Sequence, residues 1–138
     1  EMGYDRWVAQ LAADLNVAEG LELAGKVSHE ALLAHYRAAN LYVSMSEHEG
    51  FGVPLIESML LGLPVVAYGS TAVPETMGGA GVVFHHKEFE HLAELVAIIH
   101  EDAPLRRRVV EKQRAHVEHF LEPRVRGLFF SYLEQIGL

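Results

Sequence analysis

Hydrophobic side chains recur along this chain with two spacings, and these predict helices alternating with short strands. Apolar positions at a helical period predict helices at 4–15, 28–36, 53–61, 88–101 and 105–121, with a last helix after Pro123. Short apolar runs bounded by turn residues predict strands at 21–24, 41–45, 65–68 and 82–84, and a short turn or helix at 73–77. Strands that alternate with helices over short connections are typical of a mostly parallel sheet. We therefore expect an α/β, Rossmann-like fold with flanking helices.

The turn between the predicted strand 41–45 and the predicted helix 53–61 is the first candidate site. Ligands of parallel sheets bind beyond the carboxyl ends of strands, against helix N-termini. Gly50 and Gly52 let the backbone approach a ligand closely, and Pro54 suits the first helical position, where its missing N–H is not needed. An anion would be held by the free amides of Phe51, Gly52, Val53 and Leu55. Two glycines in such a turn are weak evidence by themselves.

Two carboxylates make the turn more specific. Glu49 precedes it and Glu57 follows it inside the helix. Beside a bare phosphate both would be unfavourable, but a carboxylate accepts hydrogen bonds from the vicinal hydroxyls of a sugar or ribose. Two simpler interpretations stay open: Glu57 stabilises the start of its own helix, and Glu49 is a solvated loop acid.

Composition excludes several function classes. The 138 residues carry a formal net charge of −8 and no cysteine, which argues against a general nucleic-acid binder and excludes disulfides and thiolate metal sites. The absence of cysteine also fits the expectation of a cytoplasmic protein. The apolar runs fall short of the roughly 20 residues that span a membrane. A zinc site needs three or four converging ligands, and His116 and His119 lack an evident third, so we expect no metal.

Charge is unevenly distributed along the chain. Residues 1–105 hold four basic and fifteen acidic side chains, whereas residues 106–138 hold seven basic and four acidic ones. The basic segment could contact an anionic membrane surface or balance the acidic body. Arginines at 106–108 interleave with valines as on a solvated helix face, which favours the balancing role.

The segment from Glu49 to Glu57, with sequence EGFGVPLIE, resembles the E-x7-E signature of the retaining glycosyltransferases of family 4 (group 1), which have the GT-B fold of two Rossmann-like lobes. Further segments match in order at 23–28, 38–44, 73–75 and 81–84, with Asn40 in place of the family's usual Asp. The resemblance covers roughly residues 5–120 and is specific because several spaced segments agree.

The resemblance implies a role for each motif residue. Glu49 would contact hydroxyls of the donor sugar and is the candidate catalytic residue, and Glu57 would contact the ribose. The amides of the turn would hold the diphosphate, implying Gly50, Phe51, Gly52 and Val53, with Leu55 near the nucleoside and Val27 at the base. The family transfers a sugar with retention, usually without a catalytic metal or other cofactor. The base (UDP, GDP or ADP), the sugar and the acceptor, whether glycan, lipid or small molecule, stay open.

Parts of the family's pattern are missing. The first strands of the donor lobe, with the Arg and Lys that neutralise the diphosphate, have no counterpart, and neither does the acceptor lobe. We therefore expect a single, N-terminally incomplete donor-binding domain at 1–138 that is inactive alone. In a Rossmann sheet the missing strands lie between 21–24 and 41–45, so strand 21–24 would pair non-natively unless the missing lobe or a second copy completes the sheet. The alternative function is a catalytically silent nucleotide-sugar-binding or assembly module.

Overall fold

The computed structural model describes residues 3–137, which divide into two compact units, Glu1–Ala34 and His35–Leu138. The first unit contains the helix α1 (Tyr4–Asp14), the short 3-10 helix η1 (Ala18–Gly20) and the start of α2 (His29–Ala38), inside which the division falls. The second unit holds the sheet and the other helices. Its order is β1 (Tyr42–Ser44), α3 (Val53–Leu60), β2 (Val65–Tyr68), α4 (Val73–Met77), β3 (Val82–Phe84), α5 (Phe89–Glu101), α6 (Ala103–Val117), η2 (Glu118–Phe120) and α7 (Glu122–Gln135).

The sheet of the second unit is parallel throughout, with the strand order β1-β2-β3. Tyr42 pairs with Val65 in the first ladder and Val66 pairs with Val82 in the second. The middle strand β2 is fully buried over its first three residues, as a parallel strand covered on both faces should be. The predicted α/β class and its parallel sheet are confirmed.

The core of this unit joins α3, β2, α4 and the end of α6. Its buried members are Leu55, Ile56, Met59, Val65, Ala67, Val73, Met77 and Val117. Four of the eight residues of α3 are buried, so this helix is packed along much of its length. The turn before α3 therefore leads into a helix that core packing holds in place.

Helix α6 is tied to the sheet by one polar side chain. Gln113 is fully buried; its Oε1 accepts from the amide of Val65 at 2.9 Å and its Nε2 donates to the carbonyl of Leu63 at 2.6 Å. Gly81 packs against the same place, where a Cβ would lie 2.9 Å from the Val65 carbonyl oxygen and 3.1 Å from Gln113 Oε1. The pair of hydrogen bonds satisfies both the side-chain amide and the backbone where β2 begins.

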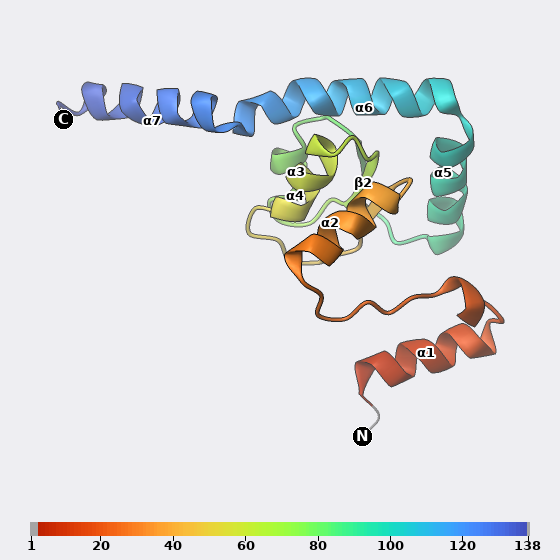
Figure 1. The fold of residues 1–138 in the computed structure, drawn as a ribbon. Helices are drawn as coiled ribbons and strands as arrows, with labels where there is room; N and C mark the ends of the chain where they lie inside the picture. The colour runs from red at the N-terminus through yellow and green to blue at the C-terminus, as the bar shows by residue number, and fades with distance from the viewer. Residues whose placement is uncertain (1–2, 138) are drawn as a thin grey trace. The chain divides into compact units, whose positions relative to one another are not determined.

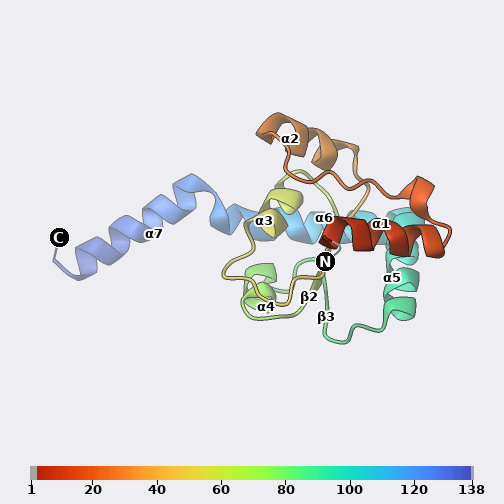
Figure 2. The same ribbon diagram turned by 90° about the horizontal axis from the view of Figure 1, so that it is seen from below.

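Helix α7 continues beyond α6 and projects past the rest of the second unit (Figure 1), and Figure 2 shows the same from a second side. None of its residues is buried, although it carries an apolar series that includes Val125, Leu128, Phe129, Phe130 and Tyr132. Within residues 3–137, the helices are too short or too polar to cross a membrane.

Most predicted elements are present, and one is absent. The strands at 65–68 and 82–84 have the predicted bounds, and Ser28 caps α2 by accepting a hydrogen bond from the amide of Ala31 at 3.2 Å. The predicted strand at 21–24 is wrong, because these residues form no ladder and have irregular backbone. A strand exists only with a partner to complete its hydrogen bonds, and within residues 3–137 this segment pairs with no strand.

Candidate functional site

The candidate site is the turn at 45–52, which follows β1 at its carboxyl end and leads into α3. Gly52 caps the helix in the left-handed region with φ 84°, and a Cβ there would lie 2.7 Å from Cδ1 of Leu55. Glycine is therefore required by both backbone conformation and space. Pro54 lies at the second helical position, one residue later than predicted, and still costs no hydrogen bond.

The amides that open α3 remain available to an anion. Within residues 3–137 the N–H groups of Phe51, Gly52 and Val53 have no hydrogen-bond acceptor. They lie at a helix N-terminus, where unpaired amides and the helix dipole favour negative charge. Leu55 corrects our expectation, because its amide donates to the Gly52 carbonyl at 2.9 Å and its side chain is 1% exposed in the core. The free-amide group is thus one residue smaller than predicted.

Besides burial, the carboxylates of Glu49 and Glu57 both raise the pKa of the nearby Tyr42 phenol. Glu49 and Glu57 are both half-buried. Burial raises the pKa of the Tyr42 phenol, with nearby Tyr36 as the next cause. The negative charges of Glu49 and Glu57 raise the same pKa further. Both carboxylates therefore act electrostatically on the first residue of β1.

Tyr36 is a contact of the motif that the sequence did not predict. Its hydroxyl donates to Oε2 of Glu57 at 3.4 Å, and its ring lies 6.1 Å from that of Tyr42. Burial, followed by the charge of Glu57, raises the pKa of the Tyr36 phenol. The helical period predicted the helix that carries Tyr36, but periodicity carries no information about a partner 21 residues away. The hydroxyl leaves the other carboxylate oxygen of Glu57 free to accept from a ligand.

Lys87 is a second residue that sequence reasoning missed. Its Nζ donates to Oε1 of Glu47 at 2.6 Å and to the Met45 carbonyl at 3.3 Å, and lies 4.6 Å from the centre of the Tyr68 ring. This hydrogen bond and the lysine charge lower the pKa of Glu47. Lys87 comes three residues after β3, so the rule that ligands gather at carboxyl ends of strands could have pointed to it. Its charge is committed to Glu47 and holds the start of the turn.

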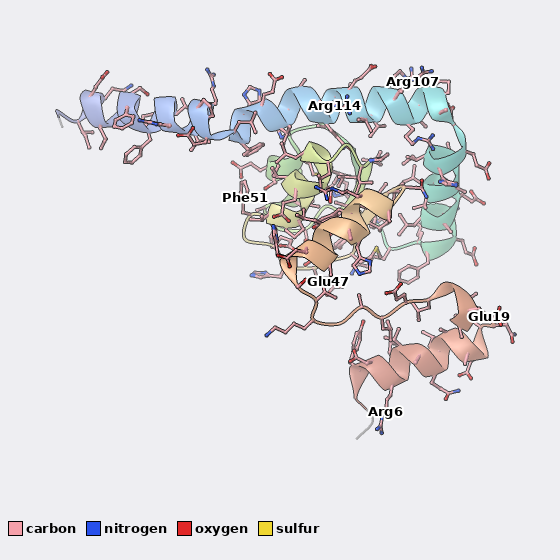
Figure 3. The ribbon with its side chains drawn as sticks, viewed as in Figure 1. Arg6, Glu19, Glu47, Phe51, Arg107 and Arg114 are labelled. Atoms are coloured by element: carbon pink, nitrogen blue, oxygen red, sulfur yellow. The ribbon has the colours of Figure 1, made fainter. Side chains whose placement is uncertain are left out.

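Phe51, the aromatic residue of the turn, packs against Phe120 of η2. The Phe51 ring meets that of Phe120 edge-to-face at 5.6 Å, and the side chain is 45% exposed. Figure 3 shows Phe51 and Glu47 in the segment before α3, and Arg107 and Arg114 on α6. Gly50 is exposed beside Phe51. Val27 belongs to the first unit, and its assignment to the base stays a prediction.

A metal site does not form in the described part of the chain: within residues 3–137 there is no group of three or more His, Asp or Glu side chains placed to share an ion. His116 and His119 face each other with ring centres 6.0 Å apart. The Nε2 atom of His116 is engaged with the carbonyl of Thr76 at 2.8 Å.

Comparison with known proteins places the chain in a family. The model of the family described as "Glycosyl transferases group 1" matches residues 2–116. O-antigen chain mannosyltransferase B of Escherichia coli is 39% identical over 85 residues, which is 59% of this chain and 22% of that protein. The GDP-mannose-dependent monoacylated alpha-(1-6)-phosphatidylinositol monomannoside mannosyltransferase of Corynebacterium glutamicum is 28% identical over 124 residues, which is 83% of this chain and 32% of that protein.

A solved structure shows the same fold. Sucrose-phosphate synthase from Thermosynechococcus elongatus superimposes with a TM-score of 0.77 at 26% sequence identity, covering 96% of this chain and 34% of that one. The chain thus spans about a third or less of the length of these similar proteins. The predicted family and its GT-B fold are confirmed.

Proposed function

The chain belongs to the group 1 glycosyl transferases, and on that premise we propose that it forms the donor-binding half of an enzyme that transfers a hexose from a nucleoside-diphosphate sugar to an acceptor with retention. In this proposal Glu49 contacts the transferred sugar and Glu57 the ribose. The amides of Phe51, Gly52 and Val53 hold the diphosphate.

One observation supports this proposal most directly: along the chain, three unpaired amides at a helix N-terminus lie between two half-buried carboxylate residues. The amides favour an anion, whereas each carboxylate favours hydroxyl donors, so the turn suits a ligand with hydroxyls on both sides of a diphosphate. A nucleotide sugar has this order of groups. A bare phosphate or a polyanion would be repelled by Glu49 and Glu57.

The names of the relatives suggest which donor to test first. Two of the similar proteins are named as mannosyltransferases, and one of them as GDP-mannose-dependent. We therefore include GDP-mannose as the leading candidate donor in the proposal, with UDP-glucose and ADP-glucose as the other members of the panel. The acceptor is a glycan, a lipid or a small molecule.

Transfer is proposed to need more than this chain. The relatives are about three times its length or longer, and the segment at 21–24 lacks the neighbours that a Rossmann sheet would supply. A further lobe or a second copy would complete the sheet. It would also supply the acceptor-binding surface and the Arg and Lys side chains that neutralise the diphosphate. We place the complete protein in the cytoplasm. The basic residues after 105 would provide peripheral contact with an anionic membrane.

The proposal is tested by calorimetry on the complete protein with the donor panel and with the matching free nucleoside diphosphates. Glu57→Ala should weaken binding of sugar donor and free diphosphate alike, because both carry ribose. Glu49→Gln should weaken only the sugar donor and should lower transfer. Loss of a hydrogen bond to a charged group is worth about 1.5–3 kcal/mol, so each affinity should fall by about tenfold to a hundredfold.

Glu94→Gln is the matched control, since Glu94 is an exposed glutamate of α5 outside the turn. It should bind and transfer as the parent protein does. If Glu49→Gln and Glu57→Ala also leave binding and transfer unchanged, the assignment of the site fails.

A further inference from the structure

The connection from β2 through α4 holds the turn of the candidate site by side-chain hydroxyls. Ser70 Oγ donates to the Ser46 carbonyl at 2.8 Å, and Thr76 Oγ1 donates to the Phe51 carbonyl at 2.5 Å. Between them, Thr71 bonds to Glu49. Three hydroxyls of one segment thus contact the backbone of the turn at its start, middle and end.

The contact at Glu49 is double. Thr71 Oγ1 accepts from the Glu49 amide at 2.8 Å and donates to the Glu49 carbonyl at 2.7 Å. A hydroxyl can do both at once because it has one proton and two lone pairs. One side chain therefore engages both backbone polar groups of the residue whose carboxylate is proposed to meet the sugar. A main chain held on both sides of its Cα has little freedom to rotate.

Thr71 makes this contact from an unfavourable backbone conformation. Its φ is +41°, in the left-handed region, where a β-branched residue is an outlier. Such a conformation costs free energy and persists when surrounding contacts determine it. A glycine would adopt it more easily but has no hydroxyl. The strained threonine is therefore accounted for by its hydrogen bonds to Glu49.

Thr71 and Thr76 differ in how deeply their side chains are buried. Thr76 is 4% exposed and lies beneath the turn, so its loss would disturb packing as well as the bond to Phe51. Thr71 is exposed, and surface substitutions usually change stability by less than about 0.5 kcal/mol. A change at Thr71 should therefore act on the geometry of Glu49 with little effect on folding.

We propose that Thr71 is a positioning residue for sugar transfer, whose hydroxyl orients the Glu49 carboxylate by holding the Glu49 backbone on both sides. This inference rests on the proposed function, because it acts through Glu49. It separates the two ends of the site: Thr71 governs the sugar end, whereas the ribose contact of Glu57 comes from α3 and is independent of Thr71.

The test compares Thr71→Val with Thr71→Ser in the complete protein. Valine keeps the β-branched shape and removes the hydroxyl, whereas serine keeps the hydroxyl. For Thr71→Val we expect kcat of transfer from the best donor of the panel to fall by about tenfold to a hundredfold, since small displacements of a reacting group have effects of this size. The Kd for the free nucleoside diphosphate should change by less than about twofold. Thr71→Ser should restore kcat to within about threefold of the parent protein.

Hydrogen exchange gives a local readout that does not depend on transfer. Peptides covering 46–52 should exchange faster in Thr71→Val than in Thr71→Ser, because the Glu49 amide loses its acceptor. A parental kcat in Thr71→Val, equal losses in the two variants, or equal weakening of diphosphate and donor binding would each overturn the inference. Glu49→Gln in the same assay distinguishes failure of the proposed function from failure of the role of Thr71. If that variant transfers normally, the proposed function fails; if it is impaired while Thr71→Val is normal, only the role of Thr71 fails.

Discussion

In the second unit, hydrophobic side chains from α3, β2 and α4 meet in one core, whereas in the first unit most large hydrophobic side chains are exposed. Met59 and Val65 are fully buried, but Trp7 is 52% exposed and Leu15 62%. Both units carry the amphipathic pattern that predicts helices, and both contain helices. The difference shows that a helical pattern fixes a local conformation, while burial needs a second surface that the pattern faces.

The comparison also locates the candidate site. The turn before α3 belongs to the second unit, where core contacts of α3 and hydrogen bonds from side-chain hydroxyls hold its backbone. The exposed apolar residues of the first unit and of α7 have the character of surfaces that a further lobe or partner covers.

The largest expected effect comes from the core. Met59→Ala removes a fully buried side chain of α3 and should lower the free energy of unfolding by about 2–5 kcal/mol. The neighbouring Leu60 is 49% exposed, and Leu60→Ala should cost less than about 1 kcal/mol. Urea unfolding of the chain followed by circular dichroism measures both. Equal losses would mean that α3 does not pack as described.

Gln113→Leu should be the next most damaging. It leaves the Val65 amide and the Leu63 carbonyl without partners in a buried place, and each unsatisfied group costs about 1–3 kcal/mol. Gln135→Leu, at an exposed position of α7, is the matched control and should be close to neutral. The same unfolding assay applies, and a neutral Gln113→Leu would contradict the role of this amide.

Trp7→Ala tests the first unit directly. In the chain alone the substitution should change the unfolding free energy by less than about 0.5 kcal/mol, because the side chain is already half exposed. In the complete protein it should cost more than about 1 kcal/mol, since we expect the exposed apolar face to be covered there. Thermal and urea unfolding of both forms decide the matter. Equally small effects in the chain alone and in the complete protein would contradict burial of this apolar face in the complete protein.

The smallest expected effect is at alkaline pH. The pKa values of Tyr36 and Tyr42 are raised by burial, so the folded state favours their protonated form. Their contribution to stability is complete below about pH 10, the ordinary pKa of tyrosine, and is lost as the pH rises through the higher folded values. Tyr36→Phe should lessen the loss above about pH 10 in urea unfolding. An unchanged pH dependence would contradict a raised pKa of Tyr36 in the folded state.

Sequence reasoning predicted those parts of the fold that depend on neighbouring residues. The strands at 65–68 and 82–84 were found with their bounds because each is a short apolar run between turn residues. The segment at 21–24 has the same local pattern and failed, because strand formation depends on a partner strand that local pattern does not report.

The site divides in the same way. The turn, its glycine and its free amides followed from the motif, apart from Leu55, whose amide closes the first turn of α3. The contacts that hold the turn did not. Thr71 lies 22 residues from Glu49, and Lys87 lies 40 residues from Glu47, so only the fold brings them together. A loop of small residues such as 69–72 looks interchangeable in sequence, and its positive φ at Thr71 is visible only in three dimensions.

The buried amide of Gln113 has a consequence for how the molecule moves. Because this side chain acts like a peptide group at the start of β2, α6 cannot slide or turn along the sheet without breaking two hydrogen bonds at once. The sheet, α3 and α6 should therefore travel as one rigid body. Helix α7, which follows the extended residue Leu121 and has no buried residue, is not bound to that body by core packing.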